Sequence, residues 1–257
     1  MLVSLMYHHI ESDQYSNSIK LINAHFEFIS NKYKTIFPNE YKKSFLRIEL
    51  CLVFDDAYFD FYFYVFPLLK KYDIKVILAV PTKFILDHST LPDVDRLEQK
   101  HNDIMIGTNY KKFESFCTWT EIKEMVDSGH VIIASHGNKH QNLLMVDKDS
   151  CINELLNSKE KIKEKTGIDT DIFVYPFGKY NKDIYNVTKE YYKYQFSIGK
   201  LINLDIKKSI IYRVYADDMI NAKKVLSPIN IMKYVLLYIF LTTFPYVFVT
   251  TFPRVRK

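Results

Sequence analysis

Two short strings hold the side chains best suited to catalysis in this chain. In the first, an apolar run ends in the paired carboxylates Asp55 and Asp56. In the second, another apolar run ends in His136 and His140, which are four positions apart. One Asp and two His form a common ligand set for Zn²⁺, and a second carboxylate beside them can act as a base. The combination is typical of a metal-dependent hydrolase.

Each string has a plainer interpretation when it is taken alone. Paired Asp residues can form a solvated turn, and His136 and His140 could be one core histidine and one surface histidine. The i, i+4 spacing, however, places both imidazoles on one helical face, within reach of one ion at about 2.0–2.1 Å. Beside the paired carboxylates, this spacing predicts a site that takes one Asp and both histidines.

A third string, Tyr175-Pro176-Phe177-Gly178, follows an apolar run at a point where the chain must turn. A backbone N–H at such a turn can point into a cavity and receive an oxyanion. Taken alone, the string indicates only a turn.

Parallel strands would bring these strings together, because active sites collect at the carboxyl ends of such strands. Continuous apolar runs alternate with helical patterns, as expected for strands buried on both faces. Seven such runs favour a barrel over an open sheet. The predicted strands are 2–6, 50–54, 75–80, 130–134, 172–175, 194–197 and 210–214. Helices are predicted over 120–126, opening with a cap at Thr120 and ending before Gly129, and over 153–166, ending before Gly167.

Segment 86–110 interrupts this alternation with polar residues that include His88 and His101. We expect a loop insertion on the same side as the strand-end loops. Such an insertion could cover the site, or it could be a passive surface loop.

Composition and charge are those of an α/β protein with a large core. The chain has 257 residues, 48% of them hydrophobic, which excludes a disordered protein. Its net charge of +5 is scattered, so no nucleic-acid partner is expected. The three cysteines match no zinc pattern and predict free buried thiols in a reducing compartment. The N-terminus has no basic region or cleavage site and is predicted to be the first strand, not a signal peptide.

Taken together, the strings resemble the motifs of the polysaccharide deacetylases of carbohydrate esterase family 4. The resemblance covers about residues 1–215 and implies an irregular (β/α)7 barrel of the α/β class. By this resemblance Asp55 is the general base and Asp56 a metal ligand. The second motif implies that His136 and His140 are the other two ligands.

The third motif of that family forms one wall of the groove and donates a backbone N–H to the oxyanion, which the resemblance assigns to residues 175–178. This chain lacks the arginine that often precedes the Pro of the motif. Arg213, at the end of the last predicted strand, could replace it and orient Asp55. The alternative is a surface arginine that pairs with Asp217 or Asp218.

The general acid also departs from the common pattern. Many family members carry it in a late Leu-x-His motif, but this chain has no histidine after His140. In the permuted branch of poly-N-acetylglucosamine deacetylases the acid lies in the first strand, and residues 5–10 resemble that motif. Because side chains alternate along a strand, only one of His8 and His9 can reach the metal, and the resemblance favours His8.

The resemblance therefore implies a metal-dependent N-deacetylase acting on an N-acetylated sugar of a polysaccharide or a lipid-linked glycan. Zn²⁺ fits the ligand set best, while Co²⁺, Mn²⁺ and Ni²⁺ also fit. Two alternatives are a hydrolase of a small non-sugar amide and a catalytically inactive glycan-binding protein of the same fold. A complete set of catalytic and ligand side chains favours an enzyme.

A hydrophobic segment, 229–257, follows the expected catalytic domain, 1–228. Residues 234–253 include no charged residue, and Arg254, Arg256 and Lys257 follow. As a helix this run would span ~30 Å, but Pro245 and the β-branched stretch 247–251 are typical of a buried final helix and strand. We expect contact with a membrane surface rather than a full span, because a span would put the basic end outside. The predicted location is the cytoplasm, peripheral at the inner face of the membrane.

Overall fold

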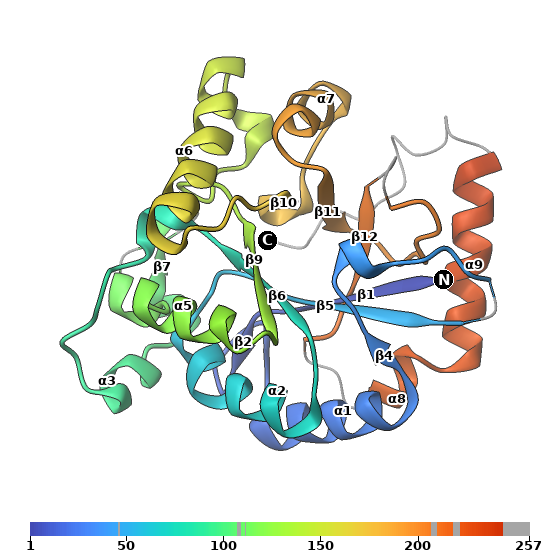
Figure 1. The fold of residues 1–257 in the computed structure, drawn as a ribbon, viewed down its shortest axis with the longest axis horizontal. Coiled ribbons are helices and arrows are strands. Elements are labelled where there is room, and N and C mark those ends of the chain that lie inside the picture. The colour runs from blue at the N-terminus through green and yellow to red at the C-terminus, as the bar shows by residue number, and fades with distance from the viewer. Residues whose placement is uncertain (46, 107–108, 111, 207–209, 218–221, 244–257) are drawn as a thin grey trace.

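Seven parallel strands close into a barrel with helices around it (Figure 1). The computed structural model describes residues 1–257 apart from 46, 107–108, 111, 207–209, 218–221 and 244–257. Around the barrel the order is β1-β12-β11-β10-β9-β6-β5, and β1 closes it by pairing with β5. The strands are β1 (Leu2–Tyr7), β5 (Glu49–Phe54), β6 (Val76–Val80), β9 (Val131–Ser135), β10 (Ile172–Val174), β11 (Tyr194–Ile198) and β12 (Ile211–Tyr215). The predicted barrel is confirmed, and each predicted strand end lies within one residue of the observed end.

Alternate strand residues belong to different apolar clusters, of which the two largest hold most of the strand residues. One cluster takes members from all seven strands, among them Cys51 and Val53, and therefore fills the barrel interior. The other takes Leu50, Leu52 and Phe54 from the same strand and packs against helices. Because side chains alternate along a strand, this pattern decides which residues beyond a strand end face inward.

Helices cover the outside of the barrel. They include α1 (Ile19–Lys32), α2 (Phe66–Tyr72), α5 (Trp119–Asp127), α6 (Lys148–Thr166), α7 (Lys182–Tyr191), α8 (Ala222–Val225) and α9 (Pro228–Thr243), and a π-helical turn, Phe61–Val65, leads into α2. Both predicted helices form and end as expected, before Gly129 and Gly167. Their starts were wrong. Thr118 caps α5 in place of Thr120, because its hydroxyl accepts from the Glu121 N–H. Asp147 caps α6, which begins at Lys148, five residues before position 153.

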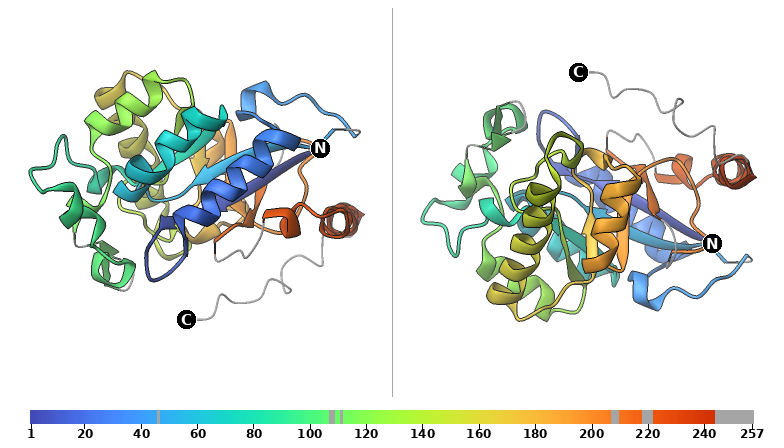
Figure 2. Two further views of the ribbon diagram at one scale, coloured as in Figure 1. Left: turned by 90° about the horizontal axis from the view of Figure 1, so that it is seen from below. Right: turned by 90° about the horizontal axis from the view of Figure 1, so that it is seen from above.

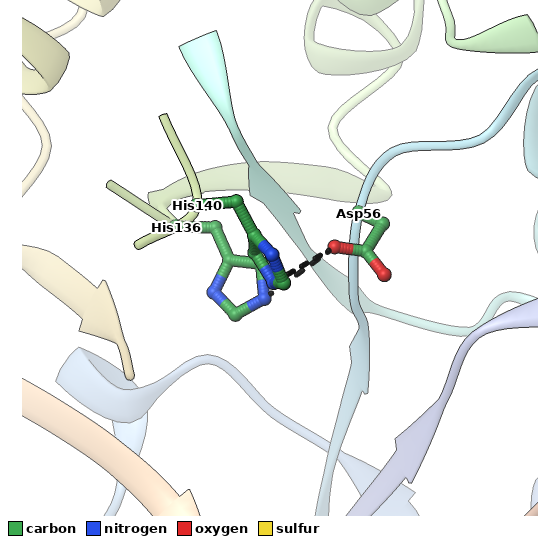
Figure 3. A group of neighbouring side chains, drawn as sticks. All are labelled: Asp56, His136 and His140. Carbon is green, nitrogen blue, oxygen red and sulfur yellow. Dashed lines mark ion pairs between the residues drawn. The ribbon is translucent and has the colours of Figure 1, made fainter. Parts of the chain in front are cut away.

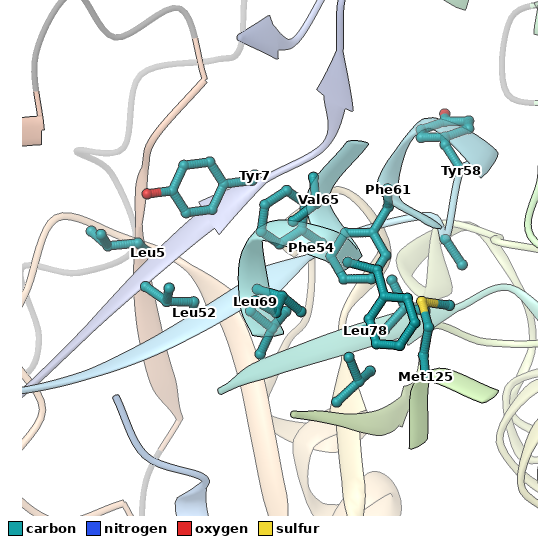
Figure 4. Close-up of a cluster of buried hydrophobic side chains, with 14 of the residues drawn as sticks. Leu5, Tyr7, Leu52, Phe54, Tyr58, Phe61, Val65, Leu69, Leu78 and Met125 are labelled. Atoms are coloured by element: carbon teal, nitrogen blue, oxygen red, sulfur yellow. The ribbon is translucent and has the colours of Figure 1, made fainter. Parts of the chain in front are cut away.

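Aromatic rings dominate the packing between β1, β5 and α2 (Figure 4). The Tyr7 and Phe54 rings stack with centroids 4.8 Å apart, and Phe61 packs on Phe54 at the same centroid distance. Leu69 of α2 is fully buried in the same cluster. This packing fixes the carboxyl ends of β1 and β5, and Asp55 and Asp56 follow directly after β5.

The segment 86–110 is not the simple loop that its composition predicts. It contains the short helices α3 (Asp93–Leu97) and α4 (His101–Ile104) and the strands β7 (Met105–Ile106) and β8 (Asn109–Tyr110). Arg96 anchors it to the barrel helices: its guanidinium pairs with Glu121 at 2.6 Å and lies 3.5 Å from the centre of the Phe59 ring. This buried cation between an aromatic ring and a carboxylate orders a segment that would otherwise have little core.

The last described helix, α9, packs on the same core as the rest of the chain, and it begins at the boundary expected between 1–228 and 229–257. That division into domains stays a prediction, and the strand-like stretch 247–251 lies outside the described residues. Among the helices that the structure describes, none is long and apolar enough to cross a membrane. Cys51, Cys117 and Cys151 are buried free thiols, as predicted.

Candidate active site

The carboxyl ends of four barrel strands gather the predicted site residues. Asp55 continues the inward row of Cys51 and Val53, and His136 continues the inward row of Ala134. The same alternation makes two further side chains face inward. Arg213 lies two positions after the inward Ile211, and His8 lies six positions after the inward Leu2. The residues are far apart in the chain, but the closed barrel points them at one another.

Asp56, His136 and His140 form a compact ligand cluster (Figure 3). One oxygen or nitrogen from each lies within 4.8 Å of the others, and all three residues are buried. His140 Nε2 lies 3.3 Å from Asp56 Oδ1, and His136 Nε2 lies 3.6 Å from the same oxygen. Within the described part of the chain this is the one group of three or more such side chains with this spacing.

The histidines are in a state suited to metal binding. His136 Nδ1 donates to the Val174 carbonyl at 2.7 Å, which leaves the Nε2 lone pair facing Asp56. Burial lowers the pKa of His140 to about 4, although the Asp56 carboxylate opposes the shift. A neutral imidazole is the form that binds a metal, so the donor set fits a divalent cation.

His136 and His140 do not share a helical face, so that prediction was wrong. They lie in a loop in which Gly137 has φ 75° and His140 has φ 53°, both left-handed. Buried Glu154 of α6 holds this loop by accepting from the backbone N–H groups of Asn138 and Lys139, at 2.9 and 2.8 Å. The imidazoles therefore converge because the loop turns back toward the barrel.

Left-handed backbone recurs at other residues of the site. Asp56 has φ 70°, Ala57 has φ 54° and Phe177 has φ 59°. Non-glycine residues adopt this conformation at a cost, and strained residues of this kind cluster at functional sites. The turn at Asp56 sends its carboxylate toward the histidines, while Asp55 stays in the inward row.

Asp55 forms a buried ion pair with Arg213. The guanidinium Nη1 lies 2.5 Å from Asp55 Oδ1, and Arg213 is fully buried. Burial by itself raises the pKa of Asp55, but Arg213, with His136 and His8, outweighs it and holds that pKa below its usual value. Asp55 is therefore ionised at neutral pH, and Arg213 is not the surface residue of the alternative reading.

His8 lies between two carboxylates. Its Nδ1 is 2.6 Å from Asp217 Oδ2, its backbone N–H donates to Asp217 Oδ1 at 3.0 Å, and its Nε2 is 3.7 Å from Asp55 Oδ2. Burial opposes protonation of His8, but Asp217, with smaller contributions from Asp55 and Asp56, raises its pKa to about 9. His8 is thus protonated at neutral pH, and its Nε2 points at Asp55.

His9 faces the other way. Its Nδ1 lies 2.7 Å from Asp60 Oδ2, its ring stacks on Tyr58 at 3.6 Å, and its Nε2 lies 3.3 Å from His101 Nδ1. The alternation along β1 thus separates the two histidines as expected. The contact with His101 also places the 86–110 segment beside the loop that follows β1.

The third string is divided between the site and the protein interior. Pro176-Phe177-Gly178 forms a short 3₁₀ turn, and the Phe177 ring lies 4.7 Å from the His140 ring. Tyr175 is fully buried, and its side chain packs against Phe173 in an outer cluster. The structure therefore brings Phe177 to the ligand cluster, but not the side chain of Tyr175.

Asp217 and Glu154 are site residues that sequence reasoning did not assign. Asp217 had been considered only as a partner for Arg213, yet it binds His8. It comes two residues after the end of β12, so the rule that points to Asp55 would also have selected it. No sequence pattern could have selected Glu154, because it accepts hydrogen bonds from a loop that lies against α6 only in the folded structure.

Comparisons of the sequence with known proteins indicate one family. A family model described as polysaccharide deacetylase matches residues 42–195. YxkH of Bacillus subtilis (strain 168), which is provisionally named a polysaccharide deacetylase, is 28% identical over 190 residues, which are 70% of this chain and 57% of the relative. This chain thus spans little more than half of that relative's length.

Solved structures share the fold at low sequence identity. A Streptococcus pyogenes deacetylase, PplD, in complex with acetate aligns with TM-score 0.70 and 19% identity, over 88% of this chain and 96% of that chain. A de-N-acetylase from Aggregatibacter actinomycetemcomitans aligns with TM-score 0.69 and 20% identity, over 90% and 98%. IcaB from Ammonifex degensii aligns with TM-score 0.66 and 20% identity, over 84% and 92%. Because the family model covers more than half of the sequence, including all three strings, the chain belongs to the polysaccharide deacetylase family.

Proposed function

We propose that this protein is a metal-dependent N-deacetylase that hydrolyses the acetamide of an N-acetylated sugar in a polysaccharide or a lipid-linked glycan. The observation that carries the proposal is the meeting of the Asp56–His136–His140 cluster with the Asp55–His8 pair at one end of the barrel. Family membership supports carbohydrate deacetylation. The relative from S. pyogenes is described as a deacetylase in complex with acetate, which such a reaction would release.

Asp56, His136 and His140 would hold the metal, with Zn²⁺ the best match to two imidazoles and a carboxylate and Co²⁺, Mn²⁺ or Ni²⁺ as alternatives. A bound cation of this kind supplies Lewis acidity, which polarises a carbonyl and lowers the pKa of a bound water. The remaining chemistry belongs to side chains of the chain.

Asp55 is the base in this proposal. Arg213 binds Oδ1 and keeps the carboxylate ionised, so Oδ2 can accept a proton from the attacking water. His8 is the acid: Nδ1 donates to Asp217, and the proton on Nε2 goes to the departing sugar nitrogen. Water adds to the carbonyl carbon, the C–N bond breaks, and acetate and a free amine leave.

Phe177 is the proposed oxyanion donor through its backbone N–H. Two observations support it: the ring lies against His140, and the left-handed φ of 59° turns the backbone at this point. Pro176 and Gly178 shape the same turn. A backbone donor held by a rigid turn needs little reorganisation as charge develops.

The experiment measures acetate released from N-acetylglucosamine oligomers by the purified full-length chain, before and after chelation and after metal is added back. We expect chelation to abolish release and metal to restore it. His140→Ala should lose both metal and activity, whereas His88→Ala, an exposed histidine in the 86–110 segment, should keep both. Release from a small aryl acetamide but from no sugar would identify an amide hydrolase, and oligomer binding without turnover would identify a binding protein.

A further inference from the structure

We propose that α9 and the groove beside it bind the surface of an anionic membrane. One side of α9 packs on the protein core through Tyr234, Ile231 and Tyr238. The other side carries five large apolar residues that are 45 to 63% exposed: Ile229, Met232, Leu236, Ile239 and Phe240. At 3.6 residues per turn these five positions fall within an arc of about 100°. They form a continuous stripe, here called the α9 stripe.

A groove of about 560 Å³ adjoins the stripe, between α1, α8 and the start of α9. Its apolar lining includes Phe28, Leu226 and Met232, and Met232 also belongs to the α9 stripe. Two lysines stand at the groove, with Lys32 Nζ 5.2 Å and Lys223 Nζ 5.9 Å from the centre of the Phe28 ring. An apolar groove flanked by two ammonium groups matches an amphiphile with an acyl chain and an anionic headgroup.

The charge of the surrounding sequence points to the same occupant. From position 219 to the end the chain contains no Asp or Glu and has six basic residues: Lys223, Lys224, Lys233, Arg254, Arg256 and Lys257. Three residues of the stripe, Leu236, Ile239 and Phe240, also lie within the uncharged, aromatic-rich sequence of residues 234–253. A protein partner or a second copy would need only an apolar face, whereas an anionic phospholipid surface uses the apolar stripe and the cations together.

The position of α9 leaves the catalytic end accessible. In Figure 1 α9 lies beside the N-terminus, at the amino end of β1, and Figure 2 shows it at the opposite end of the molecule from the segment that contains α3. Asp55 and Asp56 follow the carboxyl end of β5, which runs parallel to β1. A membrane against α9 would therefore not cover the candidate active site.

The test is flotation of the full-length chain with vesicles of phosphatidylcholine alone and of phosphatidylcholine mixed with phosphatidylglycerol. We expect roughly tenfold more protein on the anionic vesicles, and less as salt is added. Leu236→Glu should lose most of this binding. Val94→Glu is the matched control, because Val94 is also 58% exposed but lies on α3. Thermal unfolding of both variants checks that they fold.

A second pair of variants tests the cations. Lys32→Gln with Lys223→Gln should lower anionic-vesicle binding several-fold, whereas Lys189→Gln, which removes a lysine that also lies 5.9 Å from an aromatic ring, should not. Absence of flotation, or wild-type flotation of Leu236→Glu, overturns the proposal. So does a dimer in solution that Leu236→Glu dissociates, because a second copy would then cover the stripe. None of these measurements depends on catalytic activity.

Discussion

At the scale of single residues, a neighbour of opposite charge keeps each of Asp55 and His8 ionised. Arg213 beside Asp55 keeps the pKa of that carboxyl low, and Asp217 beside His8 raises the pKa of the imidazole to about 9, although burial opposes both shifts. Two groups whose pKa values are pushed apart in this way can serve as base and acid at the same pH. In the proposed reaction, this pairing would set the charge of both groups before substrate binds.

Asp217→Asn should move the alkaline limb of the pH–rate profile to lower pH. The acid works only while His8 is protonated, so kcat falls as pH rises through the His8 pKa. Because the Asp217 carboxylate is the main group that raises this pKa, its removal lowers it. The profile of kcat against pH, measured for both proteins, checks the shift. An unchanged limb would mean that another group is the acid.

His8→Ala and His9→Ala should have different effects. Loss of a general acid typically lowers kcat by about 10²–10⁴-fold, and His8→Ala should do this while it keeps its metal. His9→Ala should keep most of kcat, since His9 pairs with Asp60 and faces away from Asp55. Steady-state kinetics with metal analysis distinguish the two. A dead His9 variant beside an active His8 variant would reverse the assignment.

At the scale of elements, the turn that carries Phe177 depends on a glycine. Gly178 has φ 64°, and a Cβ placed there would lie 2.5 Å from Ile198 Cγ1 and 2.8 Å from its Cβ, both on β11. The Ile198 Cβ is bonded directly to the Cα, so no side-chain rotation moves it away. The third string is therefore positioned by close contact with the neighbouring strand as well as by its own turn.

Gly178→Ala should cost about 1–3 kcal/mol of the free energy of unfolding through overpacking, in addition to the cost of a positive φ. Gly129→Ala isolates the second cost, because Gly129 has φ 78° but no atom within 4 Å of the added Cβ. Urea denaturation of both variants gives the difference. Equal destabilisation would show that Ile198 does not restrict this turn.

Helix α1 buries a histidine that should make stability depend on pH. His25 is buried, neither ring nitrogen has a hydrogen-bond partner among the described residues, and burial lowers its pKa to about 4. Between the unfolded pKa near 6.5 and about 4, the unfolded chain binds the extra proton, so stability is lost as pH falls through this window. The loss attributable to His25 is roughly 3 kcal/mol.

His25→Leu should remove that part of the acid sensitivity, while His88→Leu on the surface should leave it unchanged. Unfolding free energies measured from pH 7 to pH 4 test this. If both variants follow the wild-type curve, His25 does not couple folding to protonation.

At the scale of the whole molecule, the candidate metal site joins loops that follow two different strands. Asp56 follows β5, whereas His136 and His140 follow β9, and β6 lies between these strands. A ligand that binds only the folded state stabilises it by about 2.7 kcal/mol at a hundred times its Kd. For a chain of this size, 1 kcal/mol shifts Tm by roughly 2–4 °C.

Adding Zn²⁺ to the chelated full-length chain should therefore raise Tm by roughly 5–10 °C at such an excess. His140→Ala should abolish the shift, and His88→Ala should keep it, which differential scanning calorimetry can measure. A similar rise in His140→Ala would place the binding elsewhere.

The cytoplasmic location expected from the sequence stays a prediction.

The sequence by itself determined the barrel and the residues at its catalytic end. Strand runs are local patterns, and alternation then decides that Asp55 faces inward and that His8 and His9 separate. The strings around Asp56 and His136 are contiguous in the chain, so they can be recognised without any knowledge of the fold. The seven strands could be placed for the same reason, because most residues of each strand are buried and form a local apolar run.

Only the tertiary structure decided how these residues are supported. His136 and His140 converge through a left-handed loop held by Glu154, and no local spacing distinguishes that loop from a helix. Asp217 reaches His8 across 209 positions, and Arg213 reaches Asp55 across 158. The sequence also could not predict which side of α9 is exposed, because an apolar helix does not show which of its faces packs on the core. Each of these outcomes depends on contacts between distant segments, and such contacts exist only once the barrel has closed.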